Sequence, residues 1–327
     1  MVKYIIKRLL LFPVILLVVS MLIFGLVNMT KVDPATTMLP SSATQEDRDA
    51  LHERLGLNEP LPKQYLNYIS KAIRGDFGES WYTGRSVWEE IKPRIPVTAK
   101  LALLTTLVVV AIALPLGVLC AVKQFSFWDN LINALAKICA SLPTFWLALI
   151  LMLVFSVRLK LTPLYGLQSW KSWLLPIAAL SLESISSYIR QCRSAMLDSI
   201  RQDFVRTARS KGCKESTVIF LHALRNAALI LVTMAGQLFA SLMGGALVIE
   251  QVFALPGLGS CVIHAITVKD VPLVVGSTLF ISIIFLSVNL VLDLLYVVVD
   301  PRVKATFVSA KRVKKHTTPK KTERMAG

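Results

Sequence analysis

The residue types most often used in catalysis and metal binding occur here without the spacing that either chemistry needs. The four histidines show no i, i+4 pairing, and the sequence holds no HExxH motif, no GxSxG turn beside a histidine and no phosphate-cradling GxxxxGK[ST] loop. The five cysteines show no CxxC pair and mostly lie in or near apolar runs, where a free cysteine acts as a small hydrophobe: Cys120, Cys139, Cys192, Cys213 and Cys261. We therefore predict no catalytic residue, no disulfide, no metal site and no directly bound cofactor.

Glu183 is an ionisable residue inside an apolar run. It follows Leu174 by nine residues, which at 1.5 Å per helical residue puts it about 14 Å into that run. An acid at this depth of a membrane is costly and often functional. Two interpretations stay open: Glu183 lines a translocation path and attracts a cation or an amine, or it is protonated or hydrogen-bonded between helices.

Residues 203–227 are a charged segment between two long apolar runs, with five Lys or Arg and two acidic residues. Its first part has the pattern of a short helix, Gly212 offers a turn with positive φ, and residues 215–227 are again helical in pattern. Glu215 at the start and Arg225 at the end of that second helix would suit its dipole. The shape is either a docking element or a surface loop whose charges only set topology.

The composition predicts an all-α integral membrane protein. Of 327 residues, 54% are hydrophobic and only 17% are charged, and the mean hydropathy is +0.61. Apolar residues cluster into runs near the ~20 residues that a membrane-spanning helix needs. A β-barrel would show short alternating segments, which these runs lack. We predict six transmembrane helices with cores at residues 9–27, 101–122, 138–157, 174–189, 228–252 and 272–299.

Lys and Arg residues set the expected orientation. They concentrate in the N-terminus, residues 123–130, residues 190–225 and the tail, whereas residues 28–100 hold ten basic and ten acidic residues. Positively charged short loops stay in the cytoplasm. We therefore predict a protein of the bacterial inner membrane with both termini on the cytoplasmic side and an uncleaved first helix. The net charge of +16 reflects this topology and does not indicate nucleic-acid binding. The basic tail at 304–327 is expected to lie near anionic membrane lipid.

Residues 29–100 are too long for a simple loop and are predicted to form an extracytoplasmic segment with two short amphipathic helices. Thr44 followed by Asp47 has the pattern of a capped helix start, with Leu51 lining one face. Pro62 can begin the second helix, and Gly75 can end it. This segment either packs in an ordinary way or contacts something that arrives from outside.

Three features predict contacts between helices. Gly236, Ala240 and Gly244 recur every four residues and would let helices approach closely, within this chain or, slightly favoured, against a partner chain. Asn289 and Asp293 share a helix face and are expected to hydrogen-bond to another helix. Residues 250–259 are predicted to form a turn at the outer mouth. His264 is expected to be an interfacial side chain.

Several blocks, in order along nearly the whole chain, resemble permeases of binding-protein-dependent ABC importers of the peptide/nickel branch. TARSKG and HALRNA resemble the signature loop of these permeases, although Arg206, Thr207 and Leu231 depart from its pattern. The other blocks are RLGLNEPLPKQY (54–65), GDFGES (75–80), IKPRIPVTAKLAL (91–103), SLPTFW (141–146), EQVFALPGLG (250–259) and DPRV (300–303). The resemblance implies the type I (MetI-like) permease fold, in which residues 1–28, 29–100, 101–303 and 304–327 are the first helix, the extracytoplasmic segment, the permease core and the tail.

The resemblance further implies a transport complex. Its other members would be a second homologous permease, two cytoplasmic ATPases that use ATP and Mg, and an extracytoplasmic solute-binding protein. It makes residues 203–227 the loop that couples to the ATPases, with six residues carried over to that role: Asp203, Ala208, Lys211, Gly212, Arg225 and Asn226.

Two other functions remain alternatives. A self-contained secondary transporter or channel would show internal repeats, which we do not find, and an intramembrane enzyme would need the catalytic groups that are missing. Within the importer branch, dipeptide, oligopeptide and nickel permeases look alike. The compact stretch TPLYGLQSWKSWLLP (162–176) resembles nickel-type members more, which favours nickel or a nickel chelate.

Overall fold

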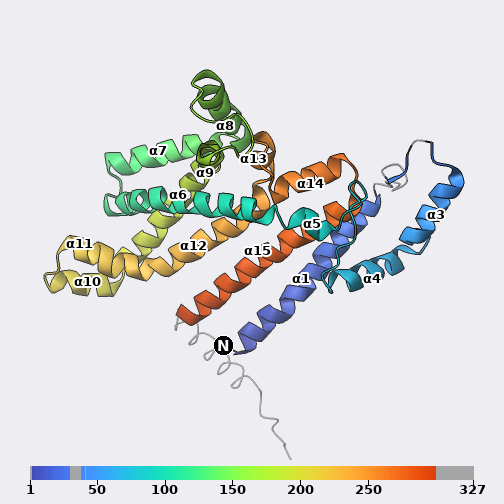
Figure 1. Cartoon of the computed structure of the whole chain (residues 1–327). Helices are drawn as coiled ribbons and strands as arrows, with labels where there is room; N and C mark the ends of the chain where they lie inside the picture. Colours follow the sequence, from blue (N-terminus) through green and yellow to red (C-terminus); the bar gives the residue numbers. More distant parts are fainter. Residues whose placement is uncertain (1, 30–37, 41, 300–327) are drawn as a thin grey trace, which may run out of the picture.

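A computed structural model describes residues 2–29, 38–40 and 42–299. The described part of the chain is helical and contains no strand, only one isolated bridge between Glu79 and Ser86. The molecule is elongated: the segment with α10 (Asp203–Ser210) and α11 (Glu215–Thr217) lies at one end, and α3 (Gln45–Leu55) and α4 (Leu61–Ala72) lie at the other (Figure 1). The basic tail and the DPRV block lie outside the described residues.

Four described helices are long and apolar enough to cross a membrane. The apolar stretches are Arg8–Leu26 in α1 (Val2–Met29), Val87–Val122 in α5 (Val87–Ile91) and α6 (Ile95–Val122), Glu215–Gly244 through α12 (Leu224–Gly245), and Val271–Leu295 in α15 (Val271–Val299). A fifth exists if the bent pair α7 (Phe127–Ser141) and α8 (Thr144–Leu151) is one span. The helix α9 (Leu174–Ile200) contains the fourth predicted span and has 27 residues, but Glu183, Arg190 and Arg193 make it more polar. The count of six therefore stays a prediction.

The third predicted span, 138–157, is wrong as a single straight helix. Helix α7 ends at Ser141, α8 starts at Thr144, and the two segments Phe127–Ser141 and Thr144–Arg158 meet at 92°. Pro143 causes the break, because it donates no backbone hydrogen bond and excludes the helical conformation at Leu142, which is extended at φ −85° and ψ 126°. A π-helix, Met152–Arg158, continues α8.

The fifth predicted span, 228–252, also has different ends. Its helix begins at Glu215, passes through a π-helix, Val218–Ala223, and ends at Gly245. Helix α13 (Leu247–Val252) is separate, and α14 (Leu258–Thr267) follows after a turn. The expectation that Arg225 closes a short helix is therefore wrong, because Arg225 lies inside a long one.

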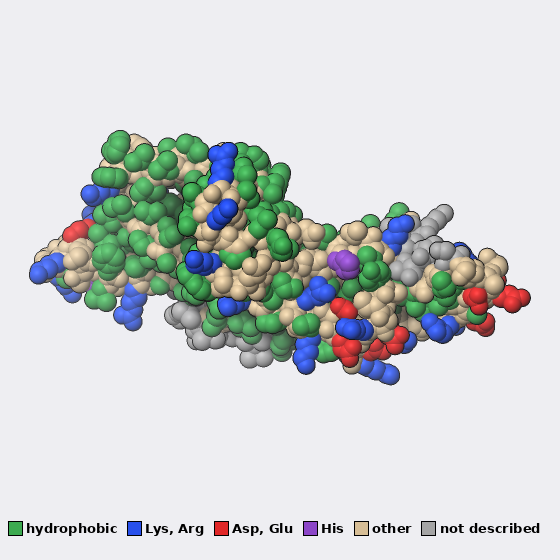
Figure 2. All heavy atoms as spheres, turned by 45° about the horizontal axis from the view of Figure 1, so that its top comes forward, with side chains coloured by type: hydrophobic (Ala, Val, Ile, Leu, Met, Phe, Trp, Pro, Cys, Tyr) green, Lys and Arg blue, Asp and Glu red, His purple; other side chains and the backbone are tan. Residues whose placement is uncertain are grey.

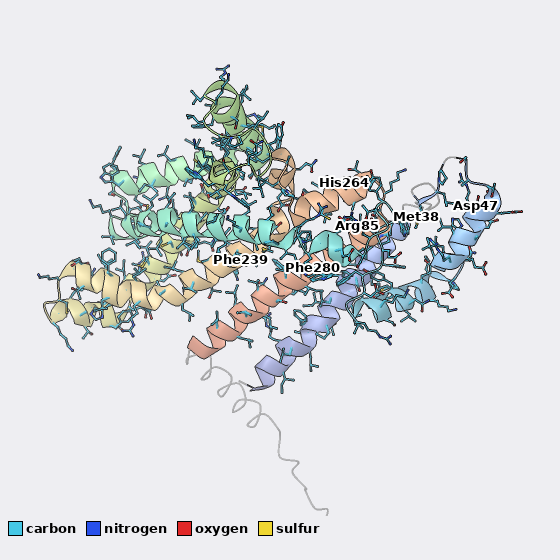
Figure 3. The ribbon with its side chains drawn as sticks, viewed as in Figure 1. Met38, Asp47, Arg85, Phe239, His264 and Phe280 are labelled. Carbon is cyan, nitrogen blue, oxygen red and sulfur yellow. The ribbon has the colours of Figure 1, made fainter. Side chains whose placement is uncertain are left out.

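The two predicted helices of residues 29–100 are confirmed as helices. Thr44 accepts from the backbone N–H of Asp47, and Asp47 accepts from that of Thr44, which closes a capping box at the start of α3. Helix α4 lies against α1, where the hydroxyls of Tyr65 and Ser20 are 2.7 Å apart and the ring of Phe24 is 5.5 Å from that of Tyr65. Figure 3 shows Asp47 far from Phe239 of α12, so α3 is remote from the helical bundle.

Two apolar clusters form the core, and both use α6 and α9. The first joins the starts of these helices to α13, α14 and α15, and the second joins their ends to α10 and the start of α12. The helices are in close contact at Gly117, where a Cβ would lie 2.6 Å from Cβ of Cys192. Outside the core, hydrophobic side chains cover the part of the surface over α7 and α8, and acidic ones gather toward the opposite end (Figure 2). Large aromatic residues of α8 are exposed there, with 49% of the surface of Phe145 and 45% of that of Trp146 accessible, which fits contact with lipid.

Gly117→Ala should destabilise the α6–α9 contact. The added methyl meets Cβ of Cys192, which is fixed to the α9 backbone and cannot rotate away, so overpacking should cost about 1–3 kcal/mol. Thermal unfolding of the detergent-solubilised protein measures the effect. Gly25→Ala in α1 is the matched control, since no atom lies within 4 Å of its added Cβ. Equal unfolding temperatures for the two variants would contradict this packing.

Candidate functional site

The charged segment 203–227 forms a helical hairpin, called here the α10–α11 hairpin, whose turn is set by Gly212. The N–H of Gly212 donates to the carbonyl of Arg209 (2.9 Å), and that of Cys213 donates to the carbonyl of Ala208 (3.3 Å). This pair of bonds is a Schellman motif, which requires a left-handed residue. Gly212 has φ +78°, so the positive φ predicted for it is confirmed.

An ion pair closes the hairpin across its turn. The guanidinium of Arg209 donates to both carboxylate oxygens of Glu215, at 3.1 and 2.5 Å, with both side chains about half exposed. The Arg209 hydrogen bond holds the pKa of Glu215 below its ordinary 4.5. The pair therefore supports the hairpin above pH 4.5, and this support is lost as the pH falls through the lowered folded-state pKa.

The base of the hairpin is anchored in the second apolar cluster. Val205 and Ala208 are buried there against the ends of α6 and α9. Ser199 of α9 donates to the carbonyl of Ala223 at 2.7 Å, and the amide of Asn226 donates to the Ser199 hydroxyl at 3.3 Å. The hairpin is therefore packed against α6 and α9 and hydrogen-bonded to α9.

Of the six residues assigned to coupling by resemblance, one is buried and five are exposed. Ala208 faces the core, and the others present themselves to solvent: Asp203, Lys211, Gly212, Arg225 and Asn226. Asp203 starts α10, with Arg206 at 4.0 Å, and Lys211 ends the helix as its C-cap. The structure thus brings these residues to one hairpin and its root.

A cavity of about 630 Å³ lies among α8, α9, α12 and α13. Glu183 is in its wall, where Oε2 accepts a hydrogen bond of 2.5 Å from Oγ1 of Thr144. Thr144 is the first residue after the Pro143 break. Glu183 therefore ties the start of α8 to α9 at the edge of the cavity.

Polar side chains follow one side of this cavity. Helix α9 contributes Glu183, Ser187 and Gln191 at intervals of four residues, and the Gln191 amide donates to the Ser187 hydroxyl at 3.1 Å. Helix α12 contributes Gln237 and Ser241. Residues four apart share a helix face, so these side chains form a stripe, called here the polar stripe. The rest of the wall is mostly apolar, with Thr144, Ser184 and Tyr188 as further polar side chains.

Glu250 is a structural residue that the sequence analysis did not single out. It is fully buried in α13, and its carboxylate accepts from Oγ1 of Thr98 at 2.6 Å and from the N–H of Ser260 at 3.0 Å. Thr98 in turn accepts from the N–H of Leu258 at 2.8 Å. A Cβ on Gly257 would lie 2.2 Å from Cδ of Glu250, so only glycine leaves room for this carboxylate. The only sequence feature that could have predicted this role was the presence of an acid ahead of the Pro256-Gly257 turn.

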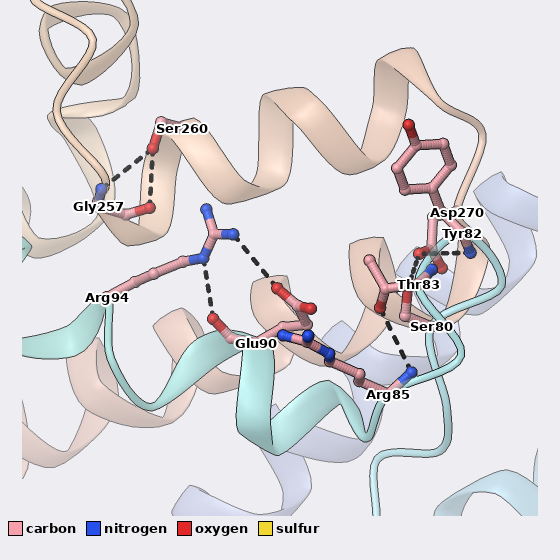
Figure 4. Close-up of polar contacts among 9 residues, drawn as sticks. All are labelled: Ser80, Tyr82, Thr83, Arg85, Glu90, Arg94, Gly257, Ser260 and Asp270. Atoms are coloured by element: carbon pink, nitrogen blue, oxygen red, sulfur yellow. Dashed lines mark hydrogen bonds and ion pairs between the residues drawn. The ribbon is translucent and has the colours of Figure 1, made fainter.

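Asp270 makes a second buried connection between distant segments (Figure 4). It is fully buried before α15 and accepts from the hydroxyl of Ser80 and from the N–H groups of Trp81 (3.1 Å) and Tyr82 (3.3 Å). Nearby, the guanidinium of Arg94 donates to the carbonyl (2.9 Å) and the carboxylate (3.3 Å) of Glu90. His264 stacks edge-on against Tyr82 with ring centres 5.7 Å apart. These contacts hold the loop before α5 onto α14 and α15.

The small-residue face of α12 packs within this chain. A Cβ on Gly236 would lie 2.2 Å from Leu292 of α15, Ala240 is fully buried, and Gly244 lies near Ile281 of α15. These small residues allow α12 to pack against α15. The face slightly favoured for contact with a partner chain therefore packs within this chain.

The last helix also pairs with the first. Asp293 forms an ion pair of 2.7 Å with Arg8 of α1, whereas the Asn289 amide donates to the carbonyl of Phe285 on its own helix. The prediction of a contact with another helix is therefore confirmed for Asp293 and wrong for Asn289. Among the described residues, no group of three His, Cys, Asp or Glu side chains could hold a metal ion.

Comparison with known proteins identifies the class. The family described as "Binding-protein-dependent transport system inner membrane component" matches residues 113–305, and its N-terminal family matches residues 1–102. The chain belongs to this family of ABC-importer permeases. Its helical fold agrees with two structures of the MetNI methionine ABC transporter, with TM-scores of 0.54 and 0.50 at 17% and 20% identity over 62% and 63% of this chain and 93% and 95% of theirs.

Curated relatives match almost end to end. A putative peptide transport system permease protein of Brucella abortus is 37% identical over 298 residues, which are 89% of this chain and 95% of the relative. The oligopeptide transport system permease protein AppB of Bacillus subtilis is 36% identical over 315 residues, 93% of this chain and 100% of AppB. The glutathione transport system permease protein GsiC of Escherichia coli K12 is 36% identical over 304 residues, 93% of this chain and 99% of GsiC.

Glu250→Ala should destabilise the junction of α6, α13 and α14. It leaves the Thr98 hydroxyl and the Ser260 N–H buried without their acceptor, at about 1–3 kcal/mol for each donor. The unfolding temperature of the solubilised protein should fall clearly. Glu89→Ala, an exposed acid on α5, is the control and should change stability by no more than about 0.5 kcal/mol. Unaltered stability of Glu250→Ala would contradict this role of the carboxylate.

Proposed function

We propose that this chain is the membrane-spanning subunit of an ATP-driven importer of short peptides. Membership of the family makes it a permease of a binding-protein-dependent system, and such systems take their energy from ATPase subunits and their cargo from a solute-binding protein. The names of the relatives, for peptides, oligopeptides and glutathione, support peptidic cargo. None of these names mentions nickel. Nickel as the cargo therefore stays a prediction from the sequence alone.

The observation that best supports coupling is the anchoring of the α10–α11 hairpin. Its exposed side offers Lys211, Arg225 and Asn226 to a partner, while its buried side is fixed to α9 and α12, which line the cavity. In this proposal, closure of two cytoplasmic ATPases moves the hairpin and shifts the cavity between inward-open and outward-open forms. Changing that equilibrium from 1:99 to 99:1 needs about 5.5 kcal/mol of differential interaction, which a flexible loop could not transmit.

The proposed complex contains a second, homologous permease that closes the open side of the cavity. Both termini and the α10–α11 hairpin lie in the cytoplasm, and six helices cross the inner membrane with α9 among them. Residues 29–100 lie outside, where the solute-binding protein docks. ATP and Mg are bound by the ATPase subunits alone. The separation of α3 and α4 from the hairpin at opposite ends of the molecule supports this topology (Figure 1).

Gly212→Val should uncouple ATP hydrolysis from uptake. No atom lies within 4 Å of an added Cβ, so the expected damage comes from forcing a β-branched residue to φ +78°, about 1–3 kcal/mol of local strain. Peptide uptake and ATP hydrolysis are measured on the complex in proteoliposomes. Gly212→Asn is the matched variant, because asparagine tolerates the left-handed region and should keep most coupling. Normal uptake in Gly212→Val would contradict the proposed role.

The proposed orientation is tested at Cys213. This thiol is exposed in the turn of the α10–α11 hairpin, next to Gly212. An impermeant thiol reagent should leave it unmodified in intact cells and modify it in inside-out membrane vesicles. Cys213→Ser controls for labelling at the other four cysteines. Modification from outside intact cells would place the hairpin on the wrong side for an ATPase.

A further inference from the structure

We infer that the cavity among α8, α9, α12 and α13 binds the protonated amino terminus of a short peptide through Glu183. This inference rests on the proposed function and adds a ligand chemistry to it. Among the residues that the structure describes, Glu183 is the only charged one in the cavity wall. The chain has 36 Lys and Arg against 20 Asp and Glu, and yet none of its described basic side chains lines this cavity. The wall therefore attracts a cationic group inside a strongly basic protein.

The position of the carboxylate leaves one oxygen for a ligand. Among the described residues, Thr144 donates to Oε2 of Glu183, and no residue donates to Oε1. The side chain is exposed to the cavity instead of being enclosed between helices. The Thr144 bond fixes the orientation of the carboxylate, and a hydrogen bond to a charged group is worth more than one between neutral groups. An ammonium group with three donors fits such an oxygen.

The polar stripe fits the rest of a peptide. Gln191 lies eight positions after Glu183 on α9, which is a rise of about 12 Å at 1.5 Å per residue. An extended peptide advances about 3.3–3.6 Å per residue, so the stripe matches three to four residues. Gln191 and Gln237 carry both donors and acceptors for peptide N–H and C=O groups. The volume of about 630 Å³ lies in the range of ligand-sized pockets.

The same side chains are a poor match for a transition metal. Such ions prefer imidazole or thiolate ligands in a fixed geometry. In the described part of the chain, neither histidine nor cysteine lines the cavity, and no second carboxylate lines it beside Glu183. An amine is held by one carboxylate with neutral acceptors, which is what the cavity offers.

The test measures ligand binding directly on the membrane complex. The permease, its partner permease and the ATPases are placed in nanodiscs without the solute-binding protein, and saturation-transfer NMR compares tri-alanine with N-acetyl-tri-alanine. Tri-alanine should give a clear signal with the wild-type complex and at least a fivefold weaker one with Glu183→Gln, whose amide can still accept from Thr144. Glu183→Asp should recover more than half of the signal, and Glu89→Gln should leave it unchanged. The acetylated peptide should be weak in all four.

Equal tri-alanine signals for the wild type and Glu183→Gln would overturn the inference, as would an acetylated peptide that binds as well as the free one. Uptake of labelled tri-alanine by wild-type proteoliposomes containing the solute-binding protein is measured separately. Absence of uptake contradicts the proposed function. If tri-alanine is taken up but binds equally well to the wild type and to Glu183→Gln, only the proposed amine site is contradicted.

Discussion

The contact between α6 and α9 is the constraint on which the rest of this structure depends. Both apolar clusters are built on these two helices, which leave no room for a side chain at Gly117 beside Cys192. Toward α13–α15, Thr98 of α6 also bonds the buried carboxylate of Glu250. The opposite ends of the two helices pack against the hairpin. The hairpin and the cavity wall are therefore connected through close-packed side chains of these helices.

Buried polar groups fix the geometry at the far end of that pair. Glu250 joins three helices through Thr98 and Ser260, and Asp270 fastens residues 80–82 to the start of α15. A fully satisfied buried carboxylate holds one arrangement, since any other would leave it unpaired at considerable cost. At the end of the molecule away from the hairpin, these hydrogen bonds add to the first apolar cluster. At the hairpin end, the second apolar cluster is joined by the bonds of Ser199.

The polar groups of the cavity stand out against this background. Among the described residues, Glu183 accepts from Thr144 of α8, and the other side chains of the polar stripe make no hydrogen bond to a neighbouring helix. Their oxygens and amides therefore remain for a ligand or for water. The break at Pro143 positions the start of α8 beside Glu183, and without it a straight helix would carry Thr144 elsewhere. The same residue that ends α7 thus shapes the cavity wall.

Local chemistry in the sequence determined the helices and several of their ends. The Thr44–Asp47 capping box and the left-handed Gly212 depend on neighbours along the chain, and the structure agrees with both. The apolar runs predicted helices, but the third run breaks at Pro143 and the helix of the fifth run ends at Gly245. Tertiary structure alone decided the rest. The burial of Glu250, the partner of Glu183 and the packing of Gly236 against Leu292 all join residues far apart in sequence. The sequence around an acid in an apolar run is the same whether the acid faces a cavity or a hydroxyl of another helix. Only the packing of the helices decides which of these surroundings the acid has.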